Sequence, residues 1–185
     1  MTEAPKRRPR LPGDLTGEER IDRILRVDLA GEYGARRIYE GQLAVLGQRA
    51  DAAPIRAMHA QEQRHLEAFE RLLVERRARP SALTPIWHVA GFALGAASAL
   101  LGREAAMACT VAVEEVIDEH YAKQSEALGA DEERLKATIE EFRQDELHHR
   151  DTGIAEGAEA APAYPVLTGA IKAGSRLAIW LSERI

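Results

Sequence analysis

The sequence predicts an all-α protein in which long amphipathic helices pack into one bundle. Apolar residues recur at steps of three and four along most of the chain, and no segment shows the two-residue alternation of a half-buried strand. Aromatic residues make up only 5% of the 185 residues, whereas alanine, leucine, glutamate and arginine, which favour helix, are abundant. A chain of this length suits one domain with a substantial core rather than two small domains.

The first helix is expected to begin after Thr16, whose hydroxyl can cap it. Glu19 stands three residues later and completes a capping box. The apolar pattern then continues to Leu46, and Gly47 is expected to end the helix.

Proline, glycine and aspartate mark the remaining boundaries. Pro54 can open a second helix that ends near Arg77, because Arg79–Pro80 interrupts it. Three further helices are predicted: 102–128, ended by Gly129; 131–153, capped by Asp131; and 166–183, after a break that contains Pro162 and Pro165.

Residues 80–101 contain no aspartate, glutamate, lysine or arginine. Three interpretations of this stretch stay open: a helix that spans a bilayer, a helix buried on the bundle, or an interfacial helix or hairpin with Trp87 at headgroup depth. Pro85, His88 and the scarcity of large apolar residues weigh against the spanning helix. The C-terminal helix adds Trp180 and a second amphipathic face. We therefore expect a membrane surface as a partner.

Charge and cysteine content exclude other classes of protein. A net charge of −5 argues against nucleic acid as a partner. Residues 1–17 are expected to form a flexible basic tail, in which Lys6–Arg10 is either solvated or a weak tether to anionic lipid, and residues 18–185 form the domain.

The single cysteine, Cys109, allows no intrachain disulfide, fits a reducing compartment and is expected to be a buried filler. No apolar signal segment follows Met1, so a cytosol-facing protein is expected.

Ionisable residues interrupt the apolar faces of four predicted helices. In the second helix the face reads Ile55, Met58, Glu62, His65, Phe69 and Leu72. In the predicted helix 131–153 the apolar face reads Leu135, Ile139, Phe142, Glu146, His149 and Gly153. The first predicted helix and the predicted helix 102–128 each place one carboxylate on the inner face, Glu32 and Glu114. The glutamates are spaced 30 residues apart (32 to 62) and 32 residues apart (114 to 146), so one αα-hairpin is used twice.

This pattern predicts a metal site rather than a solvated face. An unpaired buried charge costs several kcal/mol, so four buried carboxylates would prevent folding unless cations neutralised them. Two divalent cations cancel four negative charges, and carboxylate with imidazole donors suits iron or manganese. The same ligand set is known from di-iron bundles. The predicted ligands are Glu32, Glu62, His65, Glu114, Glu146 and His149.

Several neighbouring residues keep two interpretations. Glu115 and His148 adjoin the chosen ligands but fit the helix face less well. Asp28 and Asp118 could hold the N–H groups of ligand histidines or be solvated. Three tyrosines are expected in the core or hydrogen-bonded to a ligand: Tyr33, Tyr39 and Tyr121. Three histidines are expected at the surface or hydrogen-bonded, without metal: His59, His88 and His120.

Around these residues the sequence resembles the demethoxyubiquinone hydroxylase family of ubiquinone biosynthesis. The resemblance lies in RVDLAGEYGARRIYEGQ, AMACTVAVEEVIDEHYAKQ and EEFRQDELHHRDTG, and extends through the uncharged stretch and the C-terminal APAYPVL and LAIWLSERI. The six predicted ligands all lie in matching motifs. Leu29 departs from the family, which has histidine at this position, and this raises the question of an altered access path or ligand environment.

The resemblance implies a ferritin-like four-helix bundle with additional membrane-facing helical segments. It implies a di-iron monooxygenase that uses O2 to hydroxylate the ring of a polyprenylated, demethoxylated quinone, with two iron ions and NADH as the electron donor. No nucleotide-binding G-x-G-x-x-G motif is present. A lipid-binding accessory protein, a homodimer and a peripheral position on the cytoplasmic side of the inner membrane, or an equivalent reducing face, are also implied.

Two other functions remain alternatives. A ferritin-like iron-storage or peroxide-scavenging protein would share the ligand set, but its polar shell disagrees with the long uncharged segments. A metal-free membrane-associated scaffold is the second alternative. Iron bound to the purified chain would exclude the metal-free scaffold. Retention of the protein on liposomes would count against the iron-storage protein.

Overall fold

The computed structural model describes residues 15–47 and 49–185, which form six α-helices, three short 3-10 turns and no strand. The helices are α1 (Gly17–Leu46), α2 (Ala53–Arg76), α3 (Thr84–Leu100), α4 (Arg103–Ala127), α5 (Glu133–Ala155) and α6 (Tyr164–Ser182). The all-α prediction is confirmed. Most of the predicted basic tail, including Lys6–Arg10, lies outside the described residues.

Caps and backbone breaks act at several of the predicted boundaries. The Thr16 hydroxyl accepts a hydrogen bond from the Glu19 N–H at 3.0 Å, and the Glu19 carboxylate accepts one from the Thr16 N–H at 2.7 Å. Gly47 ends α1 with φ +65°, a conformation that glycine adopts without strain. Arg77 ends α2 in a left-handed conformation.

Two boundary predictions were wrong. Asp131 does not cap α5, because it lies in the 3-10 turn Ala130–Glu132 that precedes this helix. The last helix begins at Tyr164, so Pro165 lies in its first turn instead of in the preceding break. Proline is tolerated there because the first N–H groups of a helix have no partner within it.

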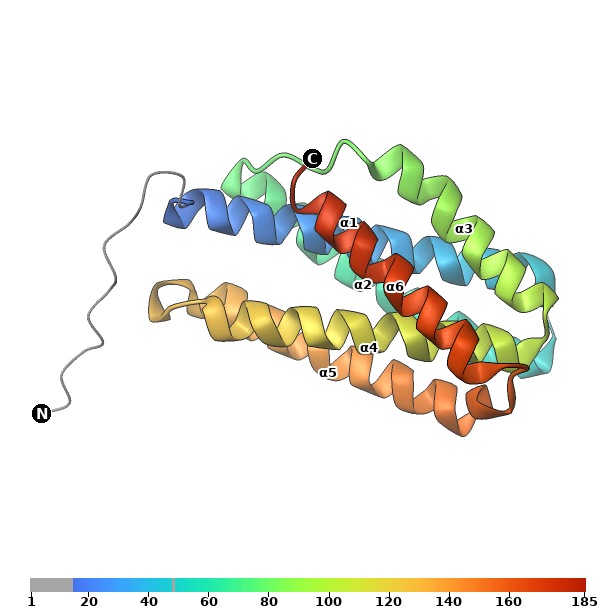
Figure 1. Cartoon of the computed structure of the whole chain (residues 1–185). Helices are drawn as coiled ribbons and strands as arrows, with labels where there is room; N and C mark the ends of the chain where they lie inside the picture. Colours follow the sequence, from blue (N-terminus) through green and yellow to red (C-terminus); the bar gives the residue numbers. More distant parts are fainter. Residues whose placement is uncertain (1–14, 48) are drawn as a thin grey trace, which may run out of the picture.

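Helices α1, α2, α4 and α5 form a four-helix bundle, and α3 and α6 pack on its outside (Figure 1). Each outer helix contacts both α1 and α4. Figure 1 shows α6 crossing in front of the bundle while α3 lies along its upper edge. This is the ferritin-like bundle with additional helices that the resemblance implied.

Glycines bring α3 unusually close to α1. A Cβ atom built on Gly41 would lie 2.2 Å from the Phe92 carbonyl oxygen, and one on Gly95 would lie 1.9 Å from the Ile38 carbonyl oxygen. Backbone therefore contacts backbone along this pair, as in glycine-rich helix contacts generally. One face of α3 is buried on the bundle and its opposite face is exposed, so the bundle-covering interpretation holds for one side only.

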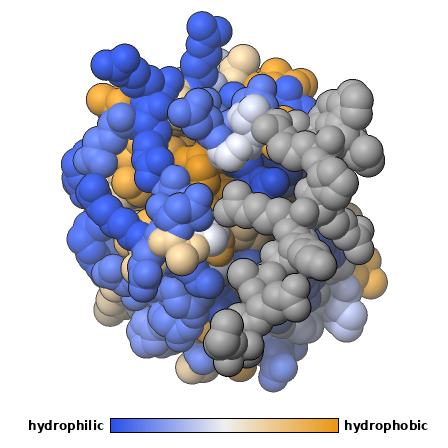
Figure 2. Space-filling view, turned by 90° about the vertical axis from the view of Figure 1, so that its left-hand side faces the viewer, coloured by the Kyte–Doolittle hydropathy of each residue, from blue (hydrophilic) through white to orange (hydrophobic). Residues whose placement is uncertain are grey.

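No helix in the described part of the chain is both long and apolar enough to cross a membrane. The outer faces of α3 and α6 nevertheless expose large apolar side chains. These are Ile86, Val89 and Leu100 on α3, and Val166, Leu177 and Trp180 on α6. The end of the bundle seen in Figure 2 differs from these faces, because mostly hydrophilic side chains surround a small hydrophobic centre there.

The apolar core is divided along the bundle axis. One cluster, with Ile55 and Met107, lies toward the C-terminal end of α1, and another, with Leu25 and Ile139, lies toward its N-terminal end. The six predicted ligands occupy the helix turns between these clusters. Cys109 is fully buried and unpaired, as predicted.

Candidate metal centre

The structure brings all six predicted ligands together inside the bundle. They come from four different helices, and each is no more than 1% exposed. Their donor atoms form two groups in which every atom lies within 4.8 Å of the others. The first group is Glu32, Glu62, His65 and Glu146, and the second is Glu62, Glu114, Glu146 and His149.

The two groups share Glu62 and Glu146. Each group therefore combines one histidine and one glutamate of its own with two shared carboxylates. A carboxylate has two oxygens and can bridge two cations, so this arrangement suits a pair of metal ions better than one. Each Glu-x-x-His helix contributes its glutamate to both groups and its histidine to one of them. The two side chains can act together because positions three apart lie on one side of a helix.

Both histidines direct Nδ1 toward the carboxylates. His65 Nδ1 lies 3.1 Å from Glu146 Oε1 and 3.4 Å from Glu32 Oε2. His149 Nδ1 lies 3.1 Å from Glu62 Oε1 and 3.1 Å from Glu146 Oε2. The nitrogen that would coordinate a metal is therefore Nδ1 in both cases.

The pKa values reflect the concentration of charge. Burial and the neighbouring Glu146 raise the pKa of both Glu62 and Glu114 well above the usual range. Burial lowers the pKa of the two histidines, but hydrogen bonds with the carboxylates outweigh it and raise the pKa of His65 to about 12 and of His149 to about 11. Burial also opposes ionisation of Glu146, yet hydrogen bonds from both histidines lower its pKa to about 2. Without metal, imidazolium protons neutralise part of the carboxylate charge.

Unpartnered oxygens show that cations fit this centre. Among the described residues, five buried carboxylate oxygens here lack a well-aligned hydrogen-bond donor, although three of them lie 3.1 to 3.4 Å from a histidine Nδ1. They are Glu32 Oε2, Glu62 Oε1, Glu62 Oε2, Glu114 Oε2 and Glu146 Oε1. Such atoms are rare in folded proteins because burying them unpaired is costly. Metal ions would satisfy them, and the mixed oxygen and imidazole donors suit iron or manganese.

Two tyrosines cross between the halves of the bundle to hold the outer glutamates. The Tyr39 hydroxyl donates to Glu114 Oε1 at 2.6 Å, and the Tyr121 hydroxyl donates to Glu32 Oε1. Both tyrosines are also buried, so the two interpretations left open for them hold together. Each follows the glutamate of its own helix by seven residues, 32 to 39 and 114 to 121.

A carboxylate that was not predicted from the sequence lies behind one of the predicted ligand histidines. His65 Nε2 lies 3.0 Å from Asp145 Oδ2. Neither predicted candidate contacts a ligand histidine, because Asp28 accepts from Gln124 at 2.7 Å and Asp118 accepts from Arg143 at 2.7 Å. No signal in the sequence indicated this contact, because Asp145 lies outside the apolar stripe of α5 and its side chain is 37% exposed.

The other polar candidates lie outside the centre. Glu115 pairs with Lys172, and His148 is exposed, in keeping with the choice of their neighbours. The remaining histidines have other partners. The Tyr33 hydroxyl lies 2.6 Å from His88 Nδ1, so the prediction for Tyr33 was wrong: it is only partly buried and contacts no predicted ligand. His59 Nε2 lies 3.6 Å from Glu40, and His120 Nε2 accepts from Gln124 at 2.8 Å.

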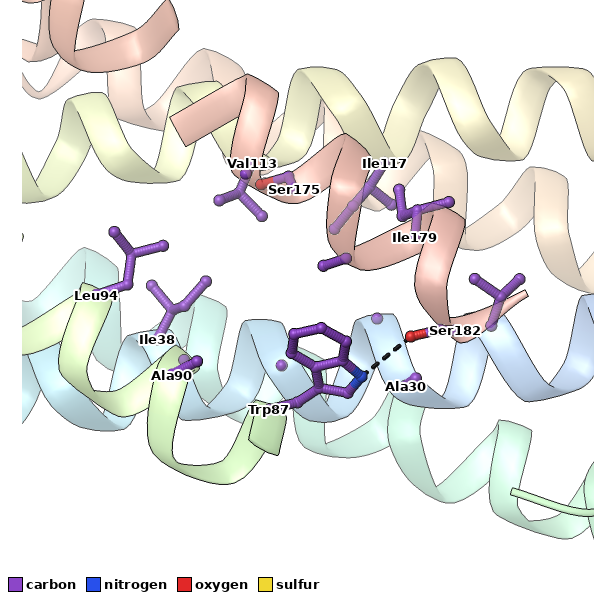
Figure 3. A pocket seen from close by; sticks show the side chains of 16 residues that line it. Ala30, Ile38, Trp87, Ala90, Leu94, Val113, Ile117, Ser175, Ile179 and Ser182 are labelled. Carbon is purple, nitrogen blue, oxygen red and sulfur yellow. Dashed lines mark hydrogen bonds between the residues drawn. The ribbon is translucent and has the colours of Figure 1, made fainter. Parts of the chain in front are cut away.

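An apolar cavity of about 330 Å³ lies between the bundle and the two outer helices. Its wall includes Val27 and Ile38 from α1, Leu94 from α3, Val113 from α4 and Ile179 from α6. Figure 3 shows these helices around the space, with the ring of Trp87 pointing toward it from α3. The Trp87 Nε1–H donates to the Ser182 hydroxyl at 3.0 Å and links α3 to α6 (Figure 3). Val113 directly precedes Glu114, so the cavity adjoins a helix that carries a candidate ligand.

Comparison with known proteins identifies the family of this chain. Residues 19–182 match the model of the family described as ubiquinone biosynthesis protein COQ7. The chain belongs to this family.

Curated members of the family are similar over nearly the whole chain. The chain is 63% identical over 177 residues to the 3-demethoxyubiquinol 3-hydroxylase of Rhodospirillum rubrum, covering 95% of this chain and 84% of the relative. It is 53% identical over 176 residues to the mitochondrial NADPH-dependent 3-demethoxyubiquinone 3-hydroxylase of Bos taurus, covering 93% and 81%. The mitochondrial 5-demethoxyubiquinone hydroxylase of Saccharomyces cerevisiae is 45% identical over 182 residues, covering 89% and 78%.

Proposed function

We propose that this protein is a 3-demethoxyubiquinol 3-hydroxylase, a di-iron monooxygenase that uses O2 to hydroxylate the ring of a demethoxylated ubiquinone precursor. The names of its relatives support the substrate class and the reaction. The observation that carries the proposal is the pair of four-residue donor groups sharing two glutamates inside the bundle. A metal-free scaffold would have no use for so many buried, unpartnered carboxylate oxygens.

The ligand assignment follows from the two groups. Glu32 and His65 would hold one iron, Glu114 and His149 the other, and Glu62 and Glu146 would bridge them. When bound, the two ferrous ions supply the electrons and the coordination positions for O2 reduction. The chain itself supplies fixed donors and apolar clusters on both sides of the centre that exclude water.

The cavity between α1, α3, α4 and α6 is the proposed quinone site. Its wall is almost wholly apolar, apart from hydroxyls such as those of Ser175 and Ser182, which suits an aromatic ring with a polyprenyl tail. None of the six predicted ligands is among the described residues that line the cavity, so we propose that the ring reaches the metals between α1 and α4. The walls position the ring and shield it from water.

The exposed apolar faces of α3 and α6 are the proposed membrane contact. Val166, Leu177 and Trp180 repeat at helical spacing on α6, and Trp180 stacks with Arg184, whose guanidinium carbon lies 4.1 Å from the ring centroid. An apolar face edged by tryptophan and arginine fits an interfacial helix. The quinone could then enter from the bilayer edge. We place the protein at the cytoplasmic side of an inner membrane or an equivalent reducing face; several relatives are named mitochondrial.

The electron donor and the protein partners remain predictions. NADH is the donor that the resemblance implied, whereas several relatives are named NADPH-dependent. A lipid-binding accessory protein and a homodimer are predicted on the same resemblance.

The test is a reaction with labelled oxygen. The iron-loaded protein is incubated with a demethoxylated quinol, NADH or NADPH, and ¹⁸O2, and the quinone is analysed by mass spectrometry. Incorporation of one ¹⁸O atom into the ring is expected. An unchanged quinone with iron accumulating far beyond two ions per chain would instead favour the storage alternative.

A further inference from the structure

The two halves of the metal centre match closely in their glutamates and tyrosines. Glu32 and Glu114 lie at equivalent places in α1 and α4, and each accepts a hydrogen bond from the tyrosine of the opposite helix. Both histidines direct Nδ1 inward, and Glu62 and Glu146 belong to both donor groups. From these contacts alone, two bound metals would have similar surroundings.

The outer nitrogens of the two histidines break this match. His65 Nε2 lies 3.0 Å from an Asp145 carboxylate oxygen. His149 Nε2 is buried and has no hydrogen-bond partner among the described residues. The sequence shows the same difference, because Asp145 stands directly before Glu146, whereas the residue directly before Glu62 is Gln61.

A carboxylate behind a ligand histidine changes the metal site. With Nδ1 on the metal, the proton of the imidazole lies on Nε2, and a carboxylate that accepts it fixes the ring and makes Nδ1 a stronger donor. The negative charge also offsets the charge of the bound cation. A histidine without this partner offers a weaker and less fixed ligand.

We infer that Asp145 is a positioning residue that makes the two metal positions unequal, so that the position of Glu32 and His65 fills before the position of Glu114 and His149. The inference rests on the proposed di-iron centre and concerns the order of filling, which that proposal leaves open. It assigns to Asp145 a role through His65 and no contact with the substrate.

The order of filling can be measured with Co²⁺ and proton NMR of the full-length protein. A histidine bound to paramagnetic Co²⁺ shows a strongly shifted, solvent-exchangeable N–H resonance, so the two histidines report separately. With about half an equivalent of Co²⁺ per chain, one such resonance is expected to dominate. In Asp145→Asn this resonance should shift, and the preference for the first position should fall about 10-fold or more, the usual effect of removing an outer partner of a metal ligand.

Two variants separate charge from structure. Asp145→Glu keeps a carboxylate and should restore part of the preference. Asp151→Asn makes the same substitution on the same helix, where the side chain is 62% exposed and paired with Arg150, and should change neither resonance. Circular dichroism of the metal-free variants checks that each has folded.

The outcomes distinguish this inference from the proposal beneath it. Two resonances that grow in parallel in the unmodified protein, or an unchanged order of filling in folded Asp145→Asn, would overturn the role of Asp145 and leave the di-iron centre standing. Absence of any shifted N–H resonance after a full titration would mean that the histidines hold no metal, and both would fail.

Discussion

The close contact between α1 and α3 gives a prediction whose size follows from the structure. A Cβ atom on Gly95 would lie 1.9 Å from the Ile38 carbonyl oxygen, whereas ordinary van der Waals contact begins at 3.4 Å. Gly95→Ala therefore requires α3 to move by about 1.5 Å, because the clash is with backbone and no side chain can rotate away. Overpacking of this kind costs about 1–3 kcal/mol.

A glycine-to-alanine substitution in α6 should instead stabilise the protein. Gly169 lies in α6 with open space around its Cα, so Gly169→Ala should gain about 0.5–1 kcal/mol from helix propensity. For a chain of this size each kcal/mol shifts the melting temperature by about 2–4 °C. We expect Gly169→Ala to melt up to about 4 °C higher and Gly95→Ala to melt several degrees lower.

Thermal unfolding followed by circular dichroism measures both variants. Because Gly91 and Leu94 line the cavity beside Gly95, the displaced helix should also raise the KM for the quinol while leaving iron content unchanged. Equal melting temperatures for the two variants would refute the backbone contact between α1 and α3.

Three further predictions concern the centre and the membrane face. Glu62→Ala should lose metal and hydroxylation together, whereas Glu67→Ala, exposed on the same helix, should lose neither; equal losses would contradict the assigned faces. The pKa of His65 is about 12 and that of His149 about 11, so a metal ion must displace a proton from each histidine and should bind more tightly as pH rises. Calorimetry in buffers of different ionisation enthalpy should show this proton release. Metal binding without proton release would contradict the protonated histidines. Leu177→Glu should weaken retention on liposomes at least several-fold without changing iron content, because charge replaces an exposed apolar side chain; undiminished retention would exclude this face.

Much of the fold could be predicted from local sequence because its causes are local. The three- and four-residue period defines the helix faces, and the capping box at Thr16 fixes the start of α1. Asp131 and Pro165 misled the prediction because each residue suits more than one position near a helix start, and the surrounding turn decides between them.

The centre was predictable to the extent that it lies on helix faces. The glutamates and histidines interrupt apolar stripes, which is visible within each helix taken alone. The hydrogen bond between Asp145 and His65 and the crossing of Tyr39 to Glu114 join residues 80 and 75 positions apart, so they depend on how the helices dock. The cavity beside the bundle likewise depends on the packing of α3 through Gly41 and Gly95.

Anomalous X-ray diffraction at the iron absorption edge, from crystals of the protein loaded with ferrous iron under anaerobic conditions, tests the central claim most directly. Two peaks are expected between the four bundle helices, both within bonding distance of Glu62 and Glu146, one beside His65 and the other beside His149. A single peak, or iron bound only outside the bundle, would contradict the di-iron centre.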